Sequence, residues 1–223
     1  MKKIITINVS PRKKGTSAML LDTLKNNLEN PGDHIHHIDL YSSQNDMRVI
    51  FDAVNAADTI VICGPCYVNT YPADTTRLLE ELAGQPGILH DQNLYGIIQG
   101  GMPYAHTHSS GLNMLRIFAK KTSIKYQGGF VMGMGALLDG KPLGKLLNGK
   151  KVEKQFSIFC KNIHNGEQSP DSVYEAALLK IPAFVTRILA ASMNRKIDKA
   201  LAARGIRTFA PYAGSASVTG TAI

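Results

Sequence analysis

The sequence predicts a three-layer α/β/α sandwich around a parallel β-sheet, and two observations lead to this fold class. Five short runs with strand character alternate with amphipathic stretches of helical period between residues 2 and 131. Most of these runs are nearly continuous in apolar residues, as in strands buried on both faces. Strands that alternate with helices form parallel sheets through right-handed crossovers, with helices on both faces. The expected strands are residues 2–9, 34–40, 59–63, 94–99 and 124–131.

The helices follow from apolar residues at intervals of three and four. The strand at 34–40 has mixed polarity, which suits an edge of the sheet, and its histidines are expected to be exposed. In the last helix Val185, Leu189, Met193, Ile197 and Leu201 recur every four residues and form a stripe that needs a partner. The sequence leaves open whether this stripe packs on its own chain or on another subunit. The expected helices are 17–29, 47–57, 73–83, 109–121, 150–165, 171–180 and 183–204.

The length predicts one main domain with an appendage. With 223 residues, 44% of them hydrophobic, the chain can bury a sizeable core. Residues 1–166, which contain the alternating pattern and the helix expected at 150–165, form the expected domain. Residues 167–209 form a C-terminal helical extension, and residues 210–223, which lack periodicity, form a loose tail.

Composition restricts the compartment and the partners. The chain opens directly on a strand without a cleavable apolar leader, and no apolar run approaches the ~20 residues of a membrane span. Three cysteines give no disulfide framework, so we expect a cytoplasmic protein without a membrane partner. The net charge of +8 is spread along the chain, and no nucleic-acid-reading motif accompanies it. Attraction to the phosphates of a cofactor explains the charge at least as well as nucleic acid does, so no nucleic-acid partner is expected.

The turn between the first strand and the first helix is the strongest candidate binding site. It reads Ser10-Pro11-Arg12-Lys13-Lys14-Gly15-Thr16-Ser17. Gly15 permits a tight turn, Thr16 or Ser17 can cap the helix, and the free N–H groups of a helix N-terminus favour an anion. The spacing fits neither the P-loop nor the dinucleotide fingerprint. A phosphomonoester is therefore the natural occupant, with an ordinary solvated turn as the alternative.

Two further loops begin where central strands end, at the edge of an open parallel sheet where ligands bind. The loop at 65–72 contains two prolines and two tyrosines, which can hold the backbone rigid and offer an aromatic face. The loop at 100–104 begins with Gly100 and Gly101, so its backbone can approach a flat ring closely. With the opening turn, these loops predict a phosphate cradle beside two walls for a heteroaromatic ring.

This order of motifs resembles the NAD(P)H-dependent FMN reductase family of flavodoxin-like proteins. The resemblance covers residues 1–131 and depends on Ser10-Pro11-Arg12 with the downstream Gly15 and Ser17, on Pro65 and Tyr67, and on Gly100-Gly101. It implies a five-stranded parallel sheet in the order 2-1-3-4-5, noncovalently bound FMN, and a homodimer or homotetramer. Members with an iron–sulfur cluster carry a cysteine motif after the second strand; residues 39–46 contain no cysteine, so no cluster is expected.

The resemblance also implies roles for individual residues. The phosphate of FMN would be held by Ser10, Arg12, Thr16 and Ser17. The isoalloxazine ring would pack along Pro65, Cys66, Tyr67, Val68 and Asn69, with Gly100 and Gly101 near its pyrimidine side. Tyr104 and His106 are the candidates for contact with substrate, and His106 and His108 are expected at the entrance of the site.

The implied function is an FMN-dependent oxidoreductase. A hydride would pass from NADPH or NADH through FMN to a quinone, a free flavin, a nitro or azo compound, or a partner protein. The flavin carries this chemistry, so no protein residue is assigned a catalytic role. A flavodoxin-like electron carrier or a flavin-binding module without activity is the alternative.

Two other chemistries are weaker. Cys63-Gly64-Pro65-Cys66 has the spacing of a dithiol redox pair, but such a pair opens a helix, and here Cys63 ends a strand ten residues before the next helix. Cys63 is therefore expected as a buried small side chain. The histidines lack a placed carboxylate or thiolate, so no metal site is expected.

Overall fold

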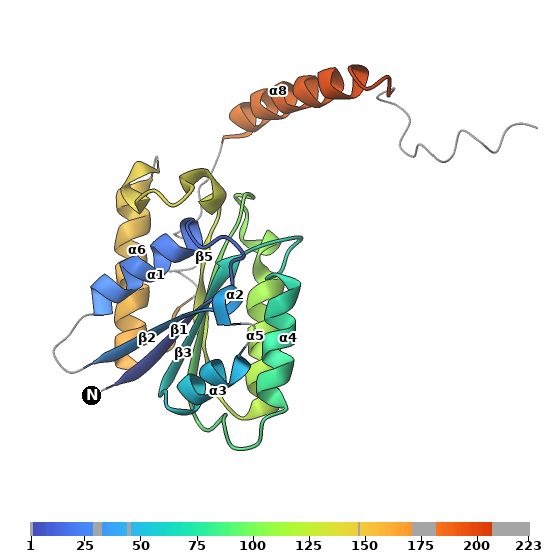
Figure 1. Cartoon of the computed structure of the whole chain (residues 1–223). Helices are drawn as coiled ribbons and strands as arrows, with labels where there is room; N and C mark the ends of the chain where they lie inside the picture. Colours follow the sequence, from blue (N-terminus) through green and yellow to red (C-terminus); the bar gives the residue numbers. More distant parts are fainter. Residues whose placement is uncertain (1, 29–32, 44–45, 147, 171–181, 207–223) are drawn as a thin grey trace, which may run out of the picture. The chain divides into compact units, whose positions relative to one another are not determined.

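In the computed structural model of the chain, five parallel strands form one sheet in the order β2-β1-β3-β4-β5 (Figure 1). This order confirms the flavodoxin-like fold that the sequence predicted. The structure describes residues 2–28, 33–43, 46–146, 148–170 and 182–206. The strands are β1 (Lys3–Asn8), β2 (His34–Asp39), β3 (Thr59–Pro65), β4 (Asn93–Gln99) and β5 (Lys125–Met132).

The burial of the strands agrees with their positions in the sheet. The three inner strands are buried along almost their whole length, since helices cover both of their faces. β2 lies at one edge, where His34, His36 and His37 are exposed, as its mixed polarity predicted. β3 runs two residues further than expected, because Gly64 and Pro65 still pair with β4.

Helices cover the sheet on two sides (Figure 1). Apolar side chains of α1 and α6 pack on one face, and those of α3, α4 and α5 pack on the other. Short 3₁₀ turns at 105–107, 135–138 and 143–145, and the helix α2, were not expected from periodicity, because they are too short to show one. The helices of this part are α1 (Thr16–Leu28), α2 (Leu40–Ser43), α3 (Met47–Asn55), α4 (Ala73–Ala83), α5 (Ser109–Thr122) and α6 (Gly149–Asn165).

The core under α6 is aromatic. Phe130 of β5 lies 4.9 Å from Phe156 and 5.6 Å from Phe159, measured between ring centroids. The hydroxyl of Tyr95 donates to the Glu167 carbonyl at 2.7 Å, just beyond the end of α6. This packing fixes α6 on β4 and β5, and the backbone N–H of Ser169 then donates to the Gln127 carbonyl of β5 at 2.7 Å.

The chain divides into two compact units, Met1–Lys180 and Ile181–Ile223. The second contains α8 (Ala183–Ala202), and within this unit no α8 side chain is buried. Its exposed apolar residues are Phe184, Ile188, Leu189, Met193 and Ile197. The helix expected at 171–180 and the tail expected at 210–223 lie outside the described residues.

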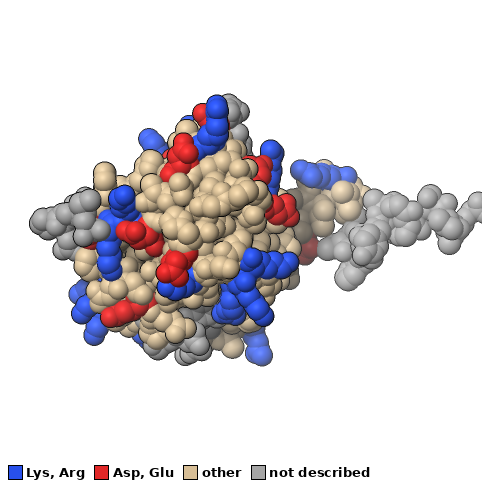
Figure 2. Space-filling model, turned by 90° about the horizontal axis from the view of Figure 1, so that it is seen from below, with Lys and Arg blue, Asp and Glu red and all other residues tan. Residues whose placement is uncertain are grey.

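Two surface properties bear on partners. None of the helices that the structure describes is both long and apolar enough to span a bilayer. On the face that Figure 2 shows, lysines and arginines form several separate groups with acidic residues between them. This face offers no single basic surface of the kind that tracks a nucleic-acid backbone.

Candidate functional site

The opening turn is shaped by its own polar side chains. Val9 is fully buried, and its Cγ2 occupies the space that a Cβ at Gly64 would need, so the chain just after β1 packs closely on β3. The Ser10 N–H donates to Asn8 Oδ1 at 3.1 Å, and the Arg12 N–H donates to Ser10 Oγ at 3.2 Å. These two local bonds fix the shape of residues 8–12 as the chain leaves β1.

Thr16 and Ser17 point their side chains inward. The Thr16 hydroxyl donates to the Gly135 carbonyl at 2.9 Å, and Ser17 Oγ accepts from Gln99 Nε2 at 3.3 Å. Both residues are buried. What they offer to an anion is therefore the backbone, because the first N–H groups of α1 have no partner within the helix.

Arg12 is one of three exposed cations of the turn, with Lys13 and Lys14, and it forms an ion pair. Its Nη1 lies 2.7 Å from Asp139 Oδ1, and both side chains are 70% exposed. Asp139 has a left-handed backbone with φ of 47°, and Gly140 after it, with φ of 82°, lies against Gly15. The Gly140 N–H points to Thr16 Oγ1 at 3.4 Å. The chain after β5 thus folds over the turn and supplies a carboxylate to its arginine.

The second loop is a tight two-residue turn at the end of β3. The N–H and C=O groups of Tyr67 and Thr70 bond to each other, at 2.7 and 3.3 Å, and Val68 and Asn69 between them have φ of 49° and 69°. Two central residues with positive φ define a type I′ turn. This geometry leaves Val68 96% exposed and Tyr67 half-exposed.

The second tyrosine of this loop does not offer an aromatic face. Tyr71 is buried, and its hydroxyl donates to the Ile97 carbonyl at 3.1 Å. The expected aromatic face of this loop therefore does not include Tyr71, because the turn reverses the chain and places the Tyr71 ring against Gly111 of α5. Tyr67 alone is left for a ligand.

The third loop is held to the second loop and to the chain after β5. Cys66 N–H donates to the Gln99 carbonyl at 2.6 Å, and Ala136 N–H donates to the Gly100 carbonyl at 3.4 Å. Gly100 is buried, whereas Gly101 is exposed, and a Cβ at Gly101 would have its nearest neighbour, Ala136 Cβ, 4.0 Å away. Gly101 is therefore the glycine at which a ring can approach the backbone.

His106 and His108 separate in the structure. His106 is exposed and stacks on Tyr104, with ring centroids 5.6 Å apart and planes inclined by 16°. His108 is 1% exposed, so its expected place at the entrance is wrong. It occupies the N-cap position of α5, which turns its ring back under the third loop.

His108 is a polar residue whose burial the hydrophobic pattern of the sequence did not predict. Its Nδ1 donates to the Tyr104 carbonyl at 3.0 Å, and its buried Nε2 has no hydrogen-bond partner among the described residues. A Cβ at Gly100 would lie 2.6 Å from this Nε2. Burial lowers the pKa of His108, aided by the charge of His106 and opposed by the bond to Tyr104. The imidazole ring is therefore neutral at pH 7, and it packs directly behind Gly100.

The chain after β5, at residues 133–140, is the part of the site that the sequence analysis did not include. It bonds to both the opening turn and the third loop, through Gly135 and Ala136. A signal for it exists in the sequence, since β5 ends at the same edge of the sheet as the other strands and is followed by Gly133, Gly135 and Gly140.

The cysteine pair lacks the environment of a dithiol centre. Cys63 is fully buried at the end of β3, and its thiol donates to the Ser17 carbonyl at 3.5 Å. Burial raises the pKa of Cys63 and that of Cys66, so neither thiol is activated. Within the described part of the chain, no three His, Cys, Asp or Glu side chains gather as metal ligands would.

The arrangement fits a phosphorylated flat ring. The turn offers backbone N–H groups and Arg12 to a phosphate, and the bond from Gln99 to Ser17 ties it to the third loop. The second loop exposes Tyr67 and Val68, and the third loop has open backbone at Gly101. The hydrogen bond from Cys66 to Gln99 joins these two loops. This donor set suits FMN, whose phosphate and ring need separate polar and apolar surroundings.

Comparison with solved structures gives the same fold. "Flavone reductase" superposes with a TM-score of 0.59 at 13% identity over 73% of this chain, which spans 62% of that protein. An FMN-dependent NADH-azoreductase from Bacillus anthracis, in complex with FMN, gives 0.55 at 16% identity over 74% of this chain and 100% of its own. An NAD(P)H:quinone oxidoreductase from Methanothermobacter marburgensis gives 0.56 at 13% identity over 75% of this chain and 97% of its own.

The family follows from comparison of the sequence with models of protein families. Comparison with curated proteins gives no match. The model of the family described as NADPH-dependent FMN reductase matches residues 2–114, which contain the opening turn and the second and third loops. This match confirms the expected oxidoreductase class and the expected cofactors, FMN with a reduced nicotinamide nucleotide. The chain belongs to the NADPH-dependent FMN reductase family.

Proposed function

We propose that the protein transfers a hydride from NADPH or NADH through bound FMN to a small acceptor, which is a quinone, a free flavin, or a nitro or azo compound. One observation carries the proposal: at one edge of the sheet, hydrogen bonds connect the anion-binding turn with the second and third loops, which expose apolar surface. When bound, FMN supplies the hydride chemistry.

The protein's part is to bind, orient and exclude water. Arg12 and the N–H groups of the first turn of α1 would hold the phosphate, together with Ser10. Residues 65–69, with Tyr67 and Val68 foremost, would cover the ring, and Gly100 and Gly101 would lie at its pyrimidine side. His106, stacked on Tyr104, would border the space for the nicotinamide or the acceptor.

The wider assignment follows the same reasoning. Residues 1–166 would form the FMN-binding domain, and residues 167–209 would serve in assembly into a homodimer or homotetramer, with 210–223 as a tail. The exposed apolar side chains of α8 support this assembly role. Free Cys63, Cys66 and Cys160 support a reducing compartment such as the cytoplasm.

The alternative is a one-electron carrier or a flavin-binding module without enzyme activity. The net charge of +8 favours the reductase, because a basic protein attracts the phosphates of a dinucleotide. A dithiol mechanism is disfavoured by the raised pKa of Cys66 and the burial of Cys63.

Reduction of the bound flavin tests the proposal. The FMN-loaded protein is mixed with NADPH or NADH without oxygen, and the visible absorption of the flavin is followed. We expect bleaching by at least one nucleotide and return of the colour when a quinone or azo dye is added. FMN that binds but is bleached by neither nucleotide would instead identify a carrier or binding module.

A further inference from the structure

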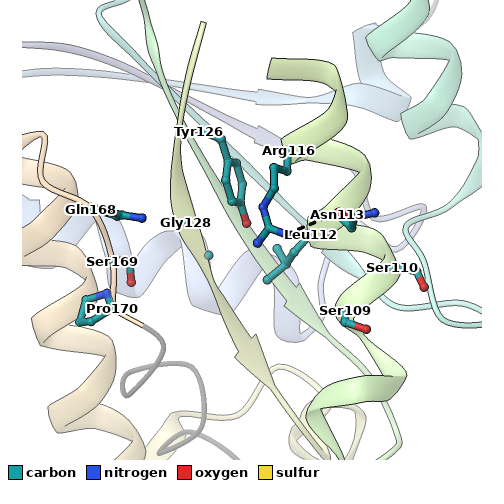
Figure 3. A pocket seen from close by; sticks show the side chains of 11 residues that line it. Ser109, Ser110, Leu112, Asn113, Arg116, Tyr126, Gly128, Gln168, Ser169 and Pro170 are labelled. Atoms are coloured by element: carbon teal, nitrogen blue, oxygen red, sulfur yellow. Dashed lines mark hydrogen bonds between the residues drawn. The ribbon is translucent and has the colours of Figure 1, made fainter. Parts of the chain in front are cut away.

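A second, unassigned groove of about 670 Å³ lies between α5 and the edge strand β5 (Figure 3). The backbone at Gly128 forms its floor, α5 forms one wall, and residues 168–170 form the other. Its volume is within the range of small-molecule sites. None of the residues assigned to FMN lines it.

The groove has the charge of an anion site. Among the described residues that line it, Arg116 is the one charged side chain, and none carries a carboxylate. The groove also contains Ser109 and Ser110, which form the first turn of α5. His108 gives this helix no side-chain cap, and the Gly111 N–H donates to the His108 carbonyl at 3.2 Å. The N–H groups of Ser109 and Ser110 therefore keep their capacity for an acceptor.

The groove also has a surface for a flat ring. The guanidinium of Arg116 lies 5.4 Å from the centroid of the Tyr126 ring, and Figure 3 shows the two side chains side by side above Gly128. Arginine planes and tyrosine faces both stack on heteroaromatic rings. On the opposite wall, the buried Oγ of Ser169 has no hydrogen-bond partner among the described residues.

The position of the groove relates it to the flavin site. The third loop, with Gly101 and the stacked Tyr104 and His106, runs directly into α5, whose first residue lines the groove. A molecule with one end at the third loop and the other in the groove has to be long. It also has to carry a negative charge and an aromatic ring at its far end, as a nicotinamide dinucleotide does.

We propose that the α5–β5 groove binds the adenosine phosphate end of the nicotinamide dinucleotide, with Arg116 pairing with a phosphate group. The proposal rests on the proposed function for its physiological ligand. Arg116 would then set the affinity for the donor without contact with FMN.

Binding of adenosine 2′,5′-bisphosphate to the FMN-free protein tests the groove directly. By calorimetry, we expect the Arg116→Gln protein to bind at least fivefold more weakly than the unchanged protein. Lys120→Gln, which removes the same charge from an exposed position of α5 outside the groove, should bind as tightly as the unchanged protein. Failure of the unchanged protein to bind the bisphosphate, or equal binding by Arg116→Gln, would overturn the proposal.

Kinetics separate this inference from the proposed function. Arg116→Gln should raise KM for NADPH at least fivefold and leave KM for reduced nicotinamide mononucleotide, which lacks the adenosine end, unchanged. An equal change for both donors contradicts the inference, as does no change for either. Absence of flavin reduction in the unchanged protein would refute the proposed function, while the calorimetric result would still decide the groove.

Discussion

Arg12 and Asp139 form an ion pair that FMN would have to break. Their side chains are both 70% exposed and 2.7 Å apart, so the pair itself is worth only ~0.2–1 kcal/mol. A phosphate at the turn would take the guanidinium from Asp139 and leave that carboxylate beside another anion. Asp139 is therefore expected to lower the affinity for FMN.

Replacing Asp139 with Asn should tighten FMN binding about two- to fivefold, the equivalent of ~0.4–1 kcal/mol. Asn tolerates the left-handed backbone at this position, so the fold of the loop is kept. Arg12→Ala should act in the opposite direction and weaken binding by ~1.5–3 kcal/mol, at least tenfold. Fluorescence titration with FMN and with riboflavin measures both, and riboflavin, which has no phosphate, should show neither effect. Weaker FMN binding by Asp139→Asn would mean that Asp139 positions Arg12.

His108 should make stability depend on pH. Its pKa is lowered in the folded protein by burial, whereas in the unfolded chain it has the ordinary value of about 6.5. Below that value the unfolded chain binds a proton that the folded protein refuses. Above pH ~6.5 protonation of His108 therefore takes nothing from the free energy of unfolding. As the pH falls from there toward the lowered pKa, the free energy of unfolding decreases, with a slope of at most ~1.4 kcal/mol per pH unit.

Denaturant unfolding between pH 5 and 8 measures this slope. His108→Asn, which keeps a good N-cap residue, should flatten it, whereas His36→Asn, at an exposed ring of the edge strand β2, should leave it unchanged. Equal slopes in the unchanged protein and in His108→Asn would show that other groups cause the dependence.

At the scale of an element, the turn at 67–70 holds an exposed apolar side chain in a backbone conformation that lowers stability. Val68 is β-branched and held at φ of 49°, a conformation that costs an L-residue ~1–2 kcal/mol. Asn or Gly suits this position of a type I′ turn better. A strained valine that is almost fully exposed is consistent with contact to a ligand.

Val68→Asn should raise the free energy of unfolding by about 1 kcal/mol and weaken FMN binding roughly fivefold, through the loss of apolar contact worth ~1 kcal/mol. Val68→Ala is the matched variant, because it removes the same contact and keeps most of the backbone penalty. Chemical denaturation and FMN titration check the two effects. Unchanged FMN affinity in both variants would remove Val68 from the ring site.

The contact between α5 and the sheet depends on glycines. A Cβ at Gly129 would lie 2.7 Å from Leu112 Cδ2 and 2.9 Å from the Gly96 carbonyl oxygen. Gly129→Ala should therefore lower the free energy of unfolding by ~1–3 kcal/mol, as overpacking does. Gly101→Ala, with no atom nearer than 4.0 Å, should change it little. Similar stability of both variants would show that α5 moves aside at little cost.

At the scale of the whole molecule, the first unit has a core of its own. Both apolar clusters lie within Met1–Lys180, whereas α8 exposes five large apolar side chains. A chain without residues 181–223 should keep its far-ultraviolet circular dichroism, since its core is complete. It should lose oligomers and retain less flavin, because the apolar stripe of α8 is then missing.

Light scattering and the ratio of flavin to protein measure these two outcomes. The double substitution Leu189→Glu and Met193→Glu in the full chain is the control for deletion, and it should have the same effect. A shortened protein that stays oligomeric and yellow would show that α8 takes no part in assembly or in flavin retention.

The sequence by itself determined the sheet, its alternation with helices, and the residues at the strand ends. Buried parallel strands read as apolar runs and helices as a 3.6-residue period, so both are local signals. The motifs Ser10-Pro11-Arg12 and Gly100-Gly101 likewise lie within single turns, and the family match includes them.

Only the tertiary structure decided which side chains face the site. Thr16, Ser17 and Tyr71 point inward because each bonds to a segment distant along the chain. His108 is buried because its ring turns back beneath the third loop, against Gly100. Asp139 reaches Arg12 across 127 residues, and the α5–β5 groove joins residues 109–116 to 168–170. Such pairings leave no periodic trace in the sequence, since they arise only when the strand ends meet at one edge.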